Sequence, residues 1–106
     1  MRYKLTDSAR ADLGRLSKDG HRSFAAAARE FSTAADRIAA DPTQTWPTRL
    51  RVKSVQGARG VWEMTWSFSG PDGRATWEWS TVRVDGQDHP AVRWRRVGDH
   101  RIFKNP

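Results

Sequence analysis

Hydrophobic residues change their spacing about halfway along the chain. Before residue 42 they recur every three or four positions, and from residue 49 they recur every second position. The first spacing is typical of helices with one buried face, and the second is typical of strands with one buried face. We therefore predict an α+β domain, in which a short strand at residues 3–6 and two helices precede an antiparallel sheet.

The two predicted helices occupy most of the first half of the chain. The first begins near Asp7, beside side chains that can cap a helix, and ends at Gly20. The second covers residues 21–40 and stops before Pro42, because the residue before a proline avoids helical dihedral angles. Its apolar residues fall on one face, which we expect to pack on a sheet: Phe24, Ala28, Phe31, Ala35 and Ile38.

Four further strands are predicted in the second half, after a connecting loop at residues 43–48. They cover residues 49–55, 61–68, 74–80 and 91–97, joined in part by a turn at residues 69–73 and a loop at residues 84–90. The apolar side of these strands is rich in tryptophan, and we expect it to form the core: Trp62, Trp66, Trp77, Trp79 and Trp94. The predicted fold is two-layered, with a helical hairpin packed on a mostly antiparallel, twisted sheet. The length of the chain fits one hydrophobic core, so we expect residues 1–106 to form a single domain.

The opposite side of the predicted sheet is polar and mostly basic. We expect His100 to lie over its end, where Gly98 releases the chain from the last strand. Trp46, in the connecting loop, is the one tryptophan that we consider as a stacking surface for a nucleic-acid base. The residues expected on this side are Arg49, Arg51, Lys53, Glu63, Thr65, Arg74, Thr76, Glu78, Arg93 and Arg95.

Composition adds a strong positive charge. The formal net charge is +7, and residues 49–106 carry eleven basic and six acidic side chains, a net of +5. A basic balance suits nucleic acid, an acidic protein partner or a solvated surface. The chain has no cysteine and no long apolar run, so we expect a soluble, cytoplasmic protein with no membrane contact. Three scattered histidines predict no metal site and no cofactor.

The polar residues could cleave RNA without a metal. The ribose 2′-OH attacks the phosphorus, so the site must accept one proton, give one to the leaving 5′-oxygen and stabilise the charge on the phosphate. His100 can exchange a proton near neutral pH, and Arg74 can hold two phosphate oxygens. Glu63 or Glu78 could be the base, although both suit salt bridges to neighbouring arginines as well. The side chains expected to hold the RNA backbone are Arg49, Arg51, Lys53, Arg59, Arg93, Arg95, Arg101 and Lys104.

Several short motifs resemble the RelE/ParE toxin superfamily of bacterial toxin–antitoxin modules, and the order of strand, two helices and terminal sheet is similar as well. The ending Gly98-Asp99-His100-Arg101-Ile102-Phe103 is most similar to the YafQ branch. The other motifs are Ala40-Asp41-Pro42 at a helix end, a strand at residues 50–55 leading to Gly57, Gly60-Val61-Trp62-Glu63-Met64, and Asp72-Gly73-Arg74.

This resemblance implies a ribonuclease that cuts mRNA on the ribosome and is neutralised by an acidic antitoxin that wraps it. It implies a catalytic role for His100 and a phosphate-binding role for Arg74. RelE-like toxins often place lysines where Glu63 and Thr65 stand here, and a tyrosine near the C-terminus, whereas Tyr3 is the only tyrosine. Two alternatives stay open: a non-enzymatic inhibitor of DNA gyrase, as in the ParE branch, and a catalytically degenerate basic module that binds RNA or protein.

Overall fold

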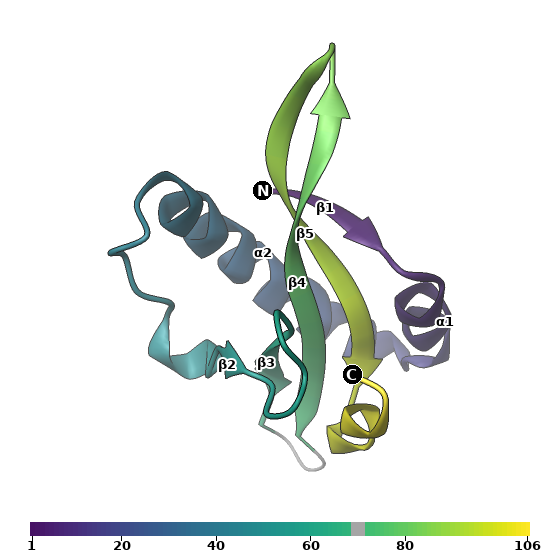
Figure 1. The fold of residues 1–106 in the computed structure, drawn as a ribbon. Coiled ribbons are helices and arrows are strands. Elements are labelled where there is room, and N and C mark those ends of the chain that lie inside the picture. Colours follow the sequence, from purple (N-terminus) through teal and green to yellow (C-terminus); the bar gives the residue numbers. More distant parts are fainter. Residues whose placement is uncertain (69–71) are drawn as a thin grey trace.

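The predicted α+β architecture is confirmed by the computed structural model, which describes residues 1–68 and 72–106. Its helices pack against a five-stranded mixed sheet (Figure 1). In chain order the elements are β1 (Arg2–Leu5), α1 (Asp7–Arg15), α2 (Lys18–Ala40), the 3-10 helix η1 (Thr48–Leu50), β2 (Lys53–Ser54), β3 (Trp62–Ser67), β4 (Gly73–Val84), β5 (Gln87–Gly98) and the 3-10 helix η2 (His100–Lys104).

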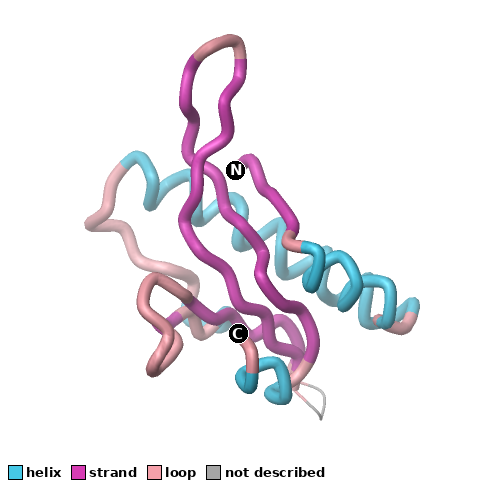
Figure 2. Tube along the Cα trace, turned by 45° about the vertical axis from the view of Figure 1, so that its right-hand side comes forward, coloured by secondary structure: helices cyan, strands magenta, loops and turns pink. Residues whose placement is uncertain are grey.

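The sheet has the strand order β1-β5-β4-β3-β2. β1 runs parallel to β5, and every other pair is antiparallel, so the prediction of a mostly antiparallel sheet is confirmed. The first strand of the chain therefore lies beside the last, as Figure 2 shows. Thr6 continues this contact, because its backbone N–H donates to the carbonyl of Trp94 at 3.0 Å.

The boundary between the two helices lies earlier than the sequence predicts. Ser17 caps α2, and its hydroxyl accepts a hydrogen bond from the backbone N–H of Gly20 at 3.0 Å. Gly20 therefore belongs to the first turn of α2 and does not end α1. At the other end, α2 stops at Ala40, before Pro42, as predicted.

Aromatic side chains from α2 and from the sheet make up the core. Phe31 of α2 lies 4.9 Å, between ring centroids, from both Trp77 and Trp94. Trp46, which we considered for base stacking, lies parallel to Phe31 at 4.8 Å and so is part of this packing. Trp79 was predicted to be buried, but it lies at the rim of the cluster with 39% of its surface exposed.

The predicted strand at residues 49–55 is mostly wrong. Pro47 begins a 3-10 turn, in which its carbonyl accepts from the N–H of Leu50 at 3.1 Å. Arg51 follows with φ at 47°, a left-handed conformation that cannot continue a strand. Only Lys53–Ser54 pairs with β3. The basic residues of this segment consequently do not share one strand face.

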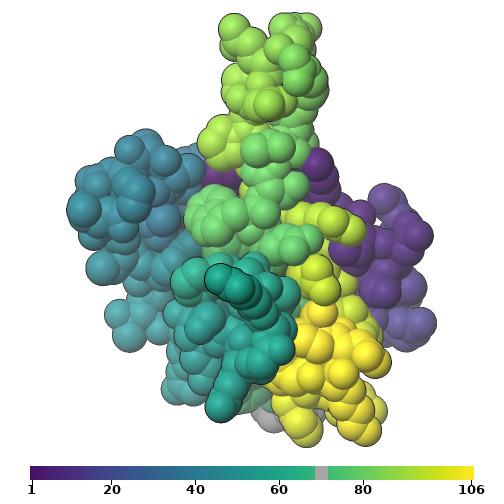
Figure 3. Space-filling view, in the orientation of Figure 1, coloured from purple at the N-terminus to yellow at the C-terminus, as the bar shows by residue number. Residues whose placement is uncertain are grey.

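The predicted loop at residues 84–90 is wrong as well, because β4 and β5 continue through it. Asp85 and Gly86 both have positive φ, 52° and 77°, which gives a two-residue turn that matches the geometry of paired strands. Val84 and Gln87 close the turn as Cα partners. The resulting ribbon projects away from the rest of the molecule in Figure 3.

A bulge at Arg95 sets the orientation of side chains at the end of β5. Thr76 pairs with Arg96 and Trp77 pairs with Trp94, which leaves Arg95 as an extra residue. Trp94 and Val97 are therefore both buried, although simple alternation would place them on opposite sides.

Among the described residues, no helix is both long and apolar enough to cross a membrane. Most of the turn predicted at residues 69–73 lies outside the described residues.

Candidate functional site

The sheet face opposite α2, here called the polar face, is sheltered at its centre. The β2–β3 loop and η2 lie in front of it in Figure 1. Thr65 and Thr76 are 1% and 0% exposed, although the sequence predicts a solvent-facing surface. Three of its side-chain atoms are buried without a hydrogen-bond partner among the described residues: Thr65 Oγ1, Thr76 Oγ1 and Arg74 Nε. Such atoms are rare in proteins, and a functional role is one common reason for them.

Arg74 is held between two carboxylates. Its Nη1 lies 3.5 Å from Glu63 Oε1, and its Nη2 lies 3.5 Å from Asp72 Oδ2. Both distances are at the long end for hydrogen bonds, and Nε has no partner among the described residues, so the guanidinium keeps donors to spare. The Arg74 side chain is only 19% exposed. Its Cα partner on β5 is Gly98, which brings the C-terminal segment beside it.

His100 is exposed and begins η2, two positions after Gly98. Asp99 caps η2 by accepting from the backbone N–H of Arg101 at 2.9 Å. The same carboxylate binds the Arg101 guanidinium, at 3.0 Å to Nε and 2.7 Å to Nη2. Hydrogen bonds from the Arg101 side chain and backbone lower the pKa of Asp99 from 3.8 to about 2. His100 therefore lies next to an ionised carboxylate whose charge is already paired with Arg101.

Glu78 joins two arginines of β5 on the polar face. Its carboxylate lies 3.4 Å from Arg93 Nη1 and 3.2 Å from Arg95 Nη1. Arg95 also donates from Nε and Nη2 to the carbonyl of Pro106, at 3.3 and 3.1 Å. Glu63 and Glu78 thus both have arginine partners, which is the salt-bridge role that the sequence left open for them.

The eight basic residues predicted to hold RNA divide into two groups. Arg93, Arg95 and Arg101 have acidic partners, as above. Arg49 has one too, because it binds Glu30 of α2 through its Nε at 2.7 Å, which places it away from the polar face. That contact raises the pKa of Arg49. Four have no acidic partner among the described residues: Arg51, Lys53, Arg59 and Lys104.

The four unpaired cations come from two segments of the chain. Arg51, Lys53 and Arg59 come from the segment around β2, and Lys104 comes from the end of η2. Arg51 also lies over the ring of Phe68, 5.1 Å from its centroid, and this ring is 52% exposed. An exposed aromatic ring beside a cation suits the stacking of a base, a role that the sequence had suggested for Trp46, although this ring lines a cleft with Arg49 and α2.

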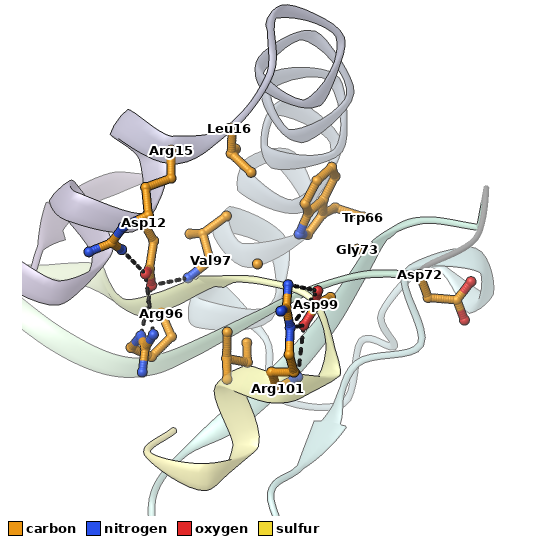
Figure 4. A pocket seen from close by; sticks show the side chains of 12 residues that line it. Asp12, Arg15, Leu16, Trp66, Asp72, Gly73, Arg96, Val97, Asp99 and Arg101 are labelled. Atoms are coloured by element: carbon orange, nitrogen blue, oxygen red, sulfur yellow. Dashed lines mark hydrogen bonds and ion pairs between the residues drawn. The ribbon is translucent and has the colours of Figure 1, made fainter.

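A cleft of about 370 Å³ opens at the end of the sheet, between α1, β4 and η2 (Figure 4). Its apolar lining includes Trp66, whose Nε1 donates to the carbonyl of Arg74 at 2.9 Å. The backbone of Gly73 lies so close to this indole that a Cβ atom there would be 2.5 Å from it. Two ion pairs stand on opposite sides of the cleft, one at Asp12 and one at Asp99.

Asp12 is a structural residue that the sequence reading missed. Only 6% exposed, it accepts hydrogen bonds from Arg96 Nε at 2.7 Å, the backbone N–H of Val97 at 3.0 Å and Arg15 at 3.1 Å. These contacts raise the pKa of Arg96. The available signal was the position of Asp12 three residues after Ala9, on the apolar side of the helix.

Residues 1–68 and 72–106 contain no group of three histidine or carboxylate side chains close enough together to bind a metal ion.

Searches of protein-family models, curated proteins and solved structures found no match to this chain.

Proposed function

We propose that this chain is the toxin of a type II toxin–antitoxin module, a cytoplasmic endoribonuclease that cuts mRNA on the ribosome and inhibits translation. The supporting observation is the pairing of Arg74 with Gly98, because it brings the segment that carries His100 to the end of the polar face. A cation with spare donors and an imidazole that can give or accept a proton are two of the parts that RNA cleavage by side chains requires.

In this proposal Arg74 binds the phosphate whose bond is cleaved. Its guanidinium stays positively charged and can offer two parallel N–H groups to phosphate oxygens, which suits the charge that develops in the transition state. The long contacts to Glu63 and Asp72 can be exchanged for phosphate contacts at small cost. The Arg51, Lys53, Arg59 and Lys104 side chains attract the rest of the RNA backbone.

His100 and Glu63 carry the two proton transfers. His100 is exposed, so it can meet the leaving 5′-oxygen and give it a proton. Glu63 lies beside Arg74 and accepts the proton of the attacking 2′-OH, whereas Glu78 is held by two arginines and keeps them in place. The bond between phosphorus and the 5′-oxygen breaks as the bond to the 2′-oxygen forms.

Expression without an antitoxin tests this function. The wild type is expected to arrest growth and to create new mRNA 5′ ends, and His100→Ala and Arg74→Ala are expected to abolish both. His89→Ala, in the projecting ribbon, is the matched control and is expected to remain toxic. Growth arrest that persists in His100→Ala, with no new 5′ ends in the wild type, would contradict the catalytic assignment.

An RNA-binding module without catalysis is the second candidate, and the ion-paired state of both glutamates favours it. This candidate predicts RNA binding that falls steeply with salt and no cleavage in ribosome complexes. The proposed partner in either case is an acidic antitoxin, attracted by the net charge of +7. A small acidic protein encoded in the neighbouring reading frame that co-purifies with this chain would support the toxin assignment.

A further inference from the structure

The ribbon formed by the ends of β4 and β5 has unpaired edges. β3 pairs with β4 only as far as Trp77, and β1 pairs with β5 only from Ala91 onward. Between these positions and the turn, the two strands pair with each other and with no other strand of the described residues. Figures 1 and 3 show the tip of this ribbon standing clear of the helices, whereas Trp79, Ser80 and Thr81 line a cleft together with the end of α2. Two strands alone are marginally stable, and an unpaired edge is a template for another strand.

The β5 edge of the ribbon is blocked. Trp94 points its carbonyl toward β1, so residues of β5 at even positions before the bulge face that side. Within the ribbon these residues are Asp88 and Pro90, and proline has no N–H to donate. A proline is one of the devices by which proteins protect the edge of a sheet, and only the β5 edge of the ribbon carries one.

The β4 edge of the ribbon is open. A two-residue turn is closed by a hydrogen-bonded pair, so Val84 points its N–H and C=O toward Gln87 of β5. Alternation then points the backbone groups of Trp79, Thr81 and Arg83 to the free side. None of the three is proline, so this edge offers three donors and three acceptors.

We propose that the β4 edges of two copies of this chain pair antiparallel about a two-fold axis and form a homodimer. Such an axis stands perpendicular to the strands. Residues that lie opposite each other must point to the same face of the sheet, so odd-numbered residues pair with odd and even with even. One residue therefore lies on the axis, opposite its own copy. Centring on Thr81 would push the turn of the second copy against Trp77, where β3 already lies. Centring on Arg83 would set two like charges directly opposite each other. Centring on Val82 avoids both conflicts.

The pairing centred on Val82 is also complementary in its side chains. Val82 meets Val82 of the second copy, and Thr81 lies opposite Arg83 of the second copy. Arg83 then has Trp79 of the second copy as its diagonal neighbour on the same face, within reach of a long side chain. That indole is 39% exposed, so a cation–π contact can replace the surface contacts that Arg83 makes with Asp88 at 3.6 Å and with the carbonyl of Gly86 at 3.1 Å. The paired segment is short, and the dimer should therefore be weak.

Cross-linking tests this arrangement directly, because the chain has no cysteine. Residues centred on the axis without mutual hydrogen bonds have Cα atoms about 4.5 Å apart, a separation that a disulfide can span. Under mild oxidation, Val82→Cys is expected to give a disulfide-linked dimer about tenfold faster than His89→Cys. His89 is the matched control, because it pairs with Val82 inside the ribbon but lies on the blocked strand.

A second substitution separates edge pairing from chance collision. Thr81→Pro removes an N–H that points to the free side, so the hydrogen bonds of the ribbon itself remain. In the Val82→Cys background it is expected to abolish cross-linking without changing the circular dichroism spectrum. Equal cross-linking rates for Val82→Cys and His89→Cys, or no effect of Thr81→Pro, would overturn the proposal. Faster cross-linking of Thr81→Cys than of Val82→Cys would overturn the register.

Discussion

Arg96 donates two hydrogen bonds to the buried carboxylate of Asp12, at 2.7 and 3.2 Å, although 84 residues separate them in the sequence. The same carboxylate accepts the backbone N–H of Val97. One side chain thus joins α1 to the central part of the sheet, next to the bulge at Arg95. Loss of its charge would leave a guanidinium partly buried without a counter-ion.

Asp12→Asn should destabilise the protein by about 3 kcal/mol, because breaking one side of a buried ion pair leaves the other side uncompensated. Urea unfolding followed by tryptophan fluorescence measures this change. Asp19→Asn is the matched control, since Asp19 is exposed and its pair with Arg22 spans 3.4 Å at the surface. The control should change stability by less than about 0.5 kcal/mol. Similar small effects for both variants would contradict the structural role of Asp12.

Gly73→Ala should destabilise the protein by about 2 kcal/mol, because the added methyl group would press into the Trp66 indole. Gly14→Ala provides the opposite control. Gly14 lies within α1 with no atom near its missing Cβ, so alanine there should stabilise the protein by about 0.5–1 kcal/mol. Thermal unfolding of the two variants should therefore shift in opposite directions. Equal shifts would show that Gly73 is not packed against Trp66.

Asp99 predicts a specific dependence of stability on pH. Its pKa is lowered to about 2, chiefly by hydrogen bonds from the Arg101 side chain. A carboxyl whose pKa is lowered on folding stabilises the folded state above its ordinary value of 3.8, and that contribution is lost as the pH falls toward about 2. Asp99→Asn should therefore be less stable than the wild type at pH 6, and the difference should shrink between pH 4 and pH 2. A difference that stays constant over this range would contradict the assignment.

RNA binding should depend more on the unpaired cations than on the paired ones. Each phosphate contact to a single strand contributes a slope of about 0.7 to the dependence of log affinity on log salt concentration. The double variant Lys53→Ala/Arg59→Ala should therefore lower the slope by about 1.4. Arg83→Ala, in the ribbon, removes a cation far from the polar face and should leave the slope unchanged. Binding measured by fluorescence anisotropy across a salt series checks both values.

Phe68 should contribute to RNA binding through its exposed ring. Phe68→Ala should weaken the binding of single-stranded RNA by about 1–3 kcal/mol, as loss of one stacked base does in other proteins. Phe68→Trp keeps a flat ring beside Arg51 and should retain binding. Equal binding by the wild type and Phe68→Ala would remove this ring from the interface. Circular dichroism confirms that each variant is folded.

The sequence predicts the layers of the fold well, because burial sets the spacing of apolar residues. Phe24 and Phe31 recur at helical spacing, and both are buried against tryptophans of the sheet. Local backbone chemistry is where the predictions were wrong. Asp85-Gly86 is a strong signal for a two-residue hairpin turn, whereas the predicted loop at residues 84–90 followed the weaker apolar pattern of that segment. The alternation around Arg51 resembled a strand, but the backbone closes a 3-10 turn there.

Partners of charged residues could not be predicted from spacing in the sequence. Arg49 binds Glu30 on a helix, and Asp12 binds Arg96 from the far end of the chain. Such pairs depend on how the layers pack, and a bulge of one residue decides which way a side chain points. Trp46 is a similar case, because its loop folds back to stack the indole on Phe31. The sequence therefore identified the basic residues but not which of them lack an acidic partner in the folded protein.

The parallel pairing of β1 with β5 has a consequence for how this protein folds during its synthesis. Arg2 can meet its partner Ala91 only after β5 has left the ribosomal tunnel, so the pairing of β5 with β1 and with β4 cannot be completed earlier. Contacts between such distant residues slow folding. Arg74 faces Gly98 only at that final stage. The strand pairing on which the proposed site depends therefore forms late during synthesis.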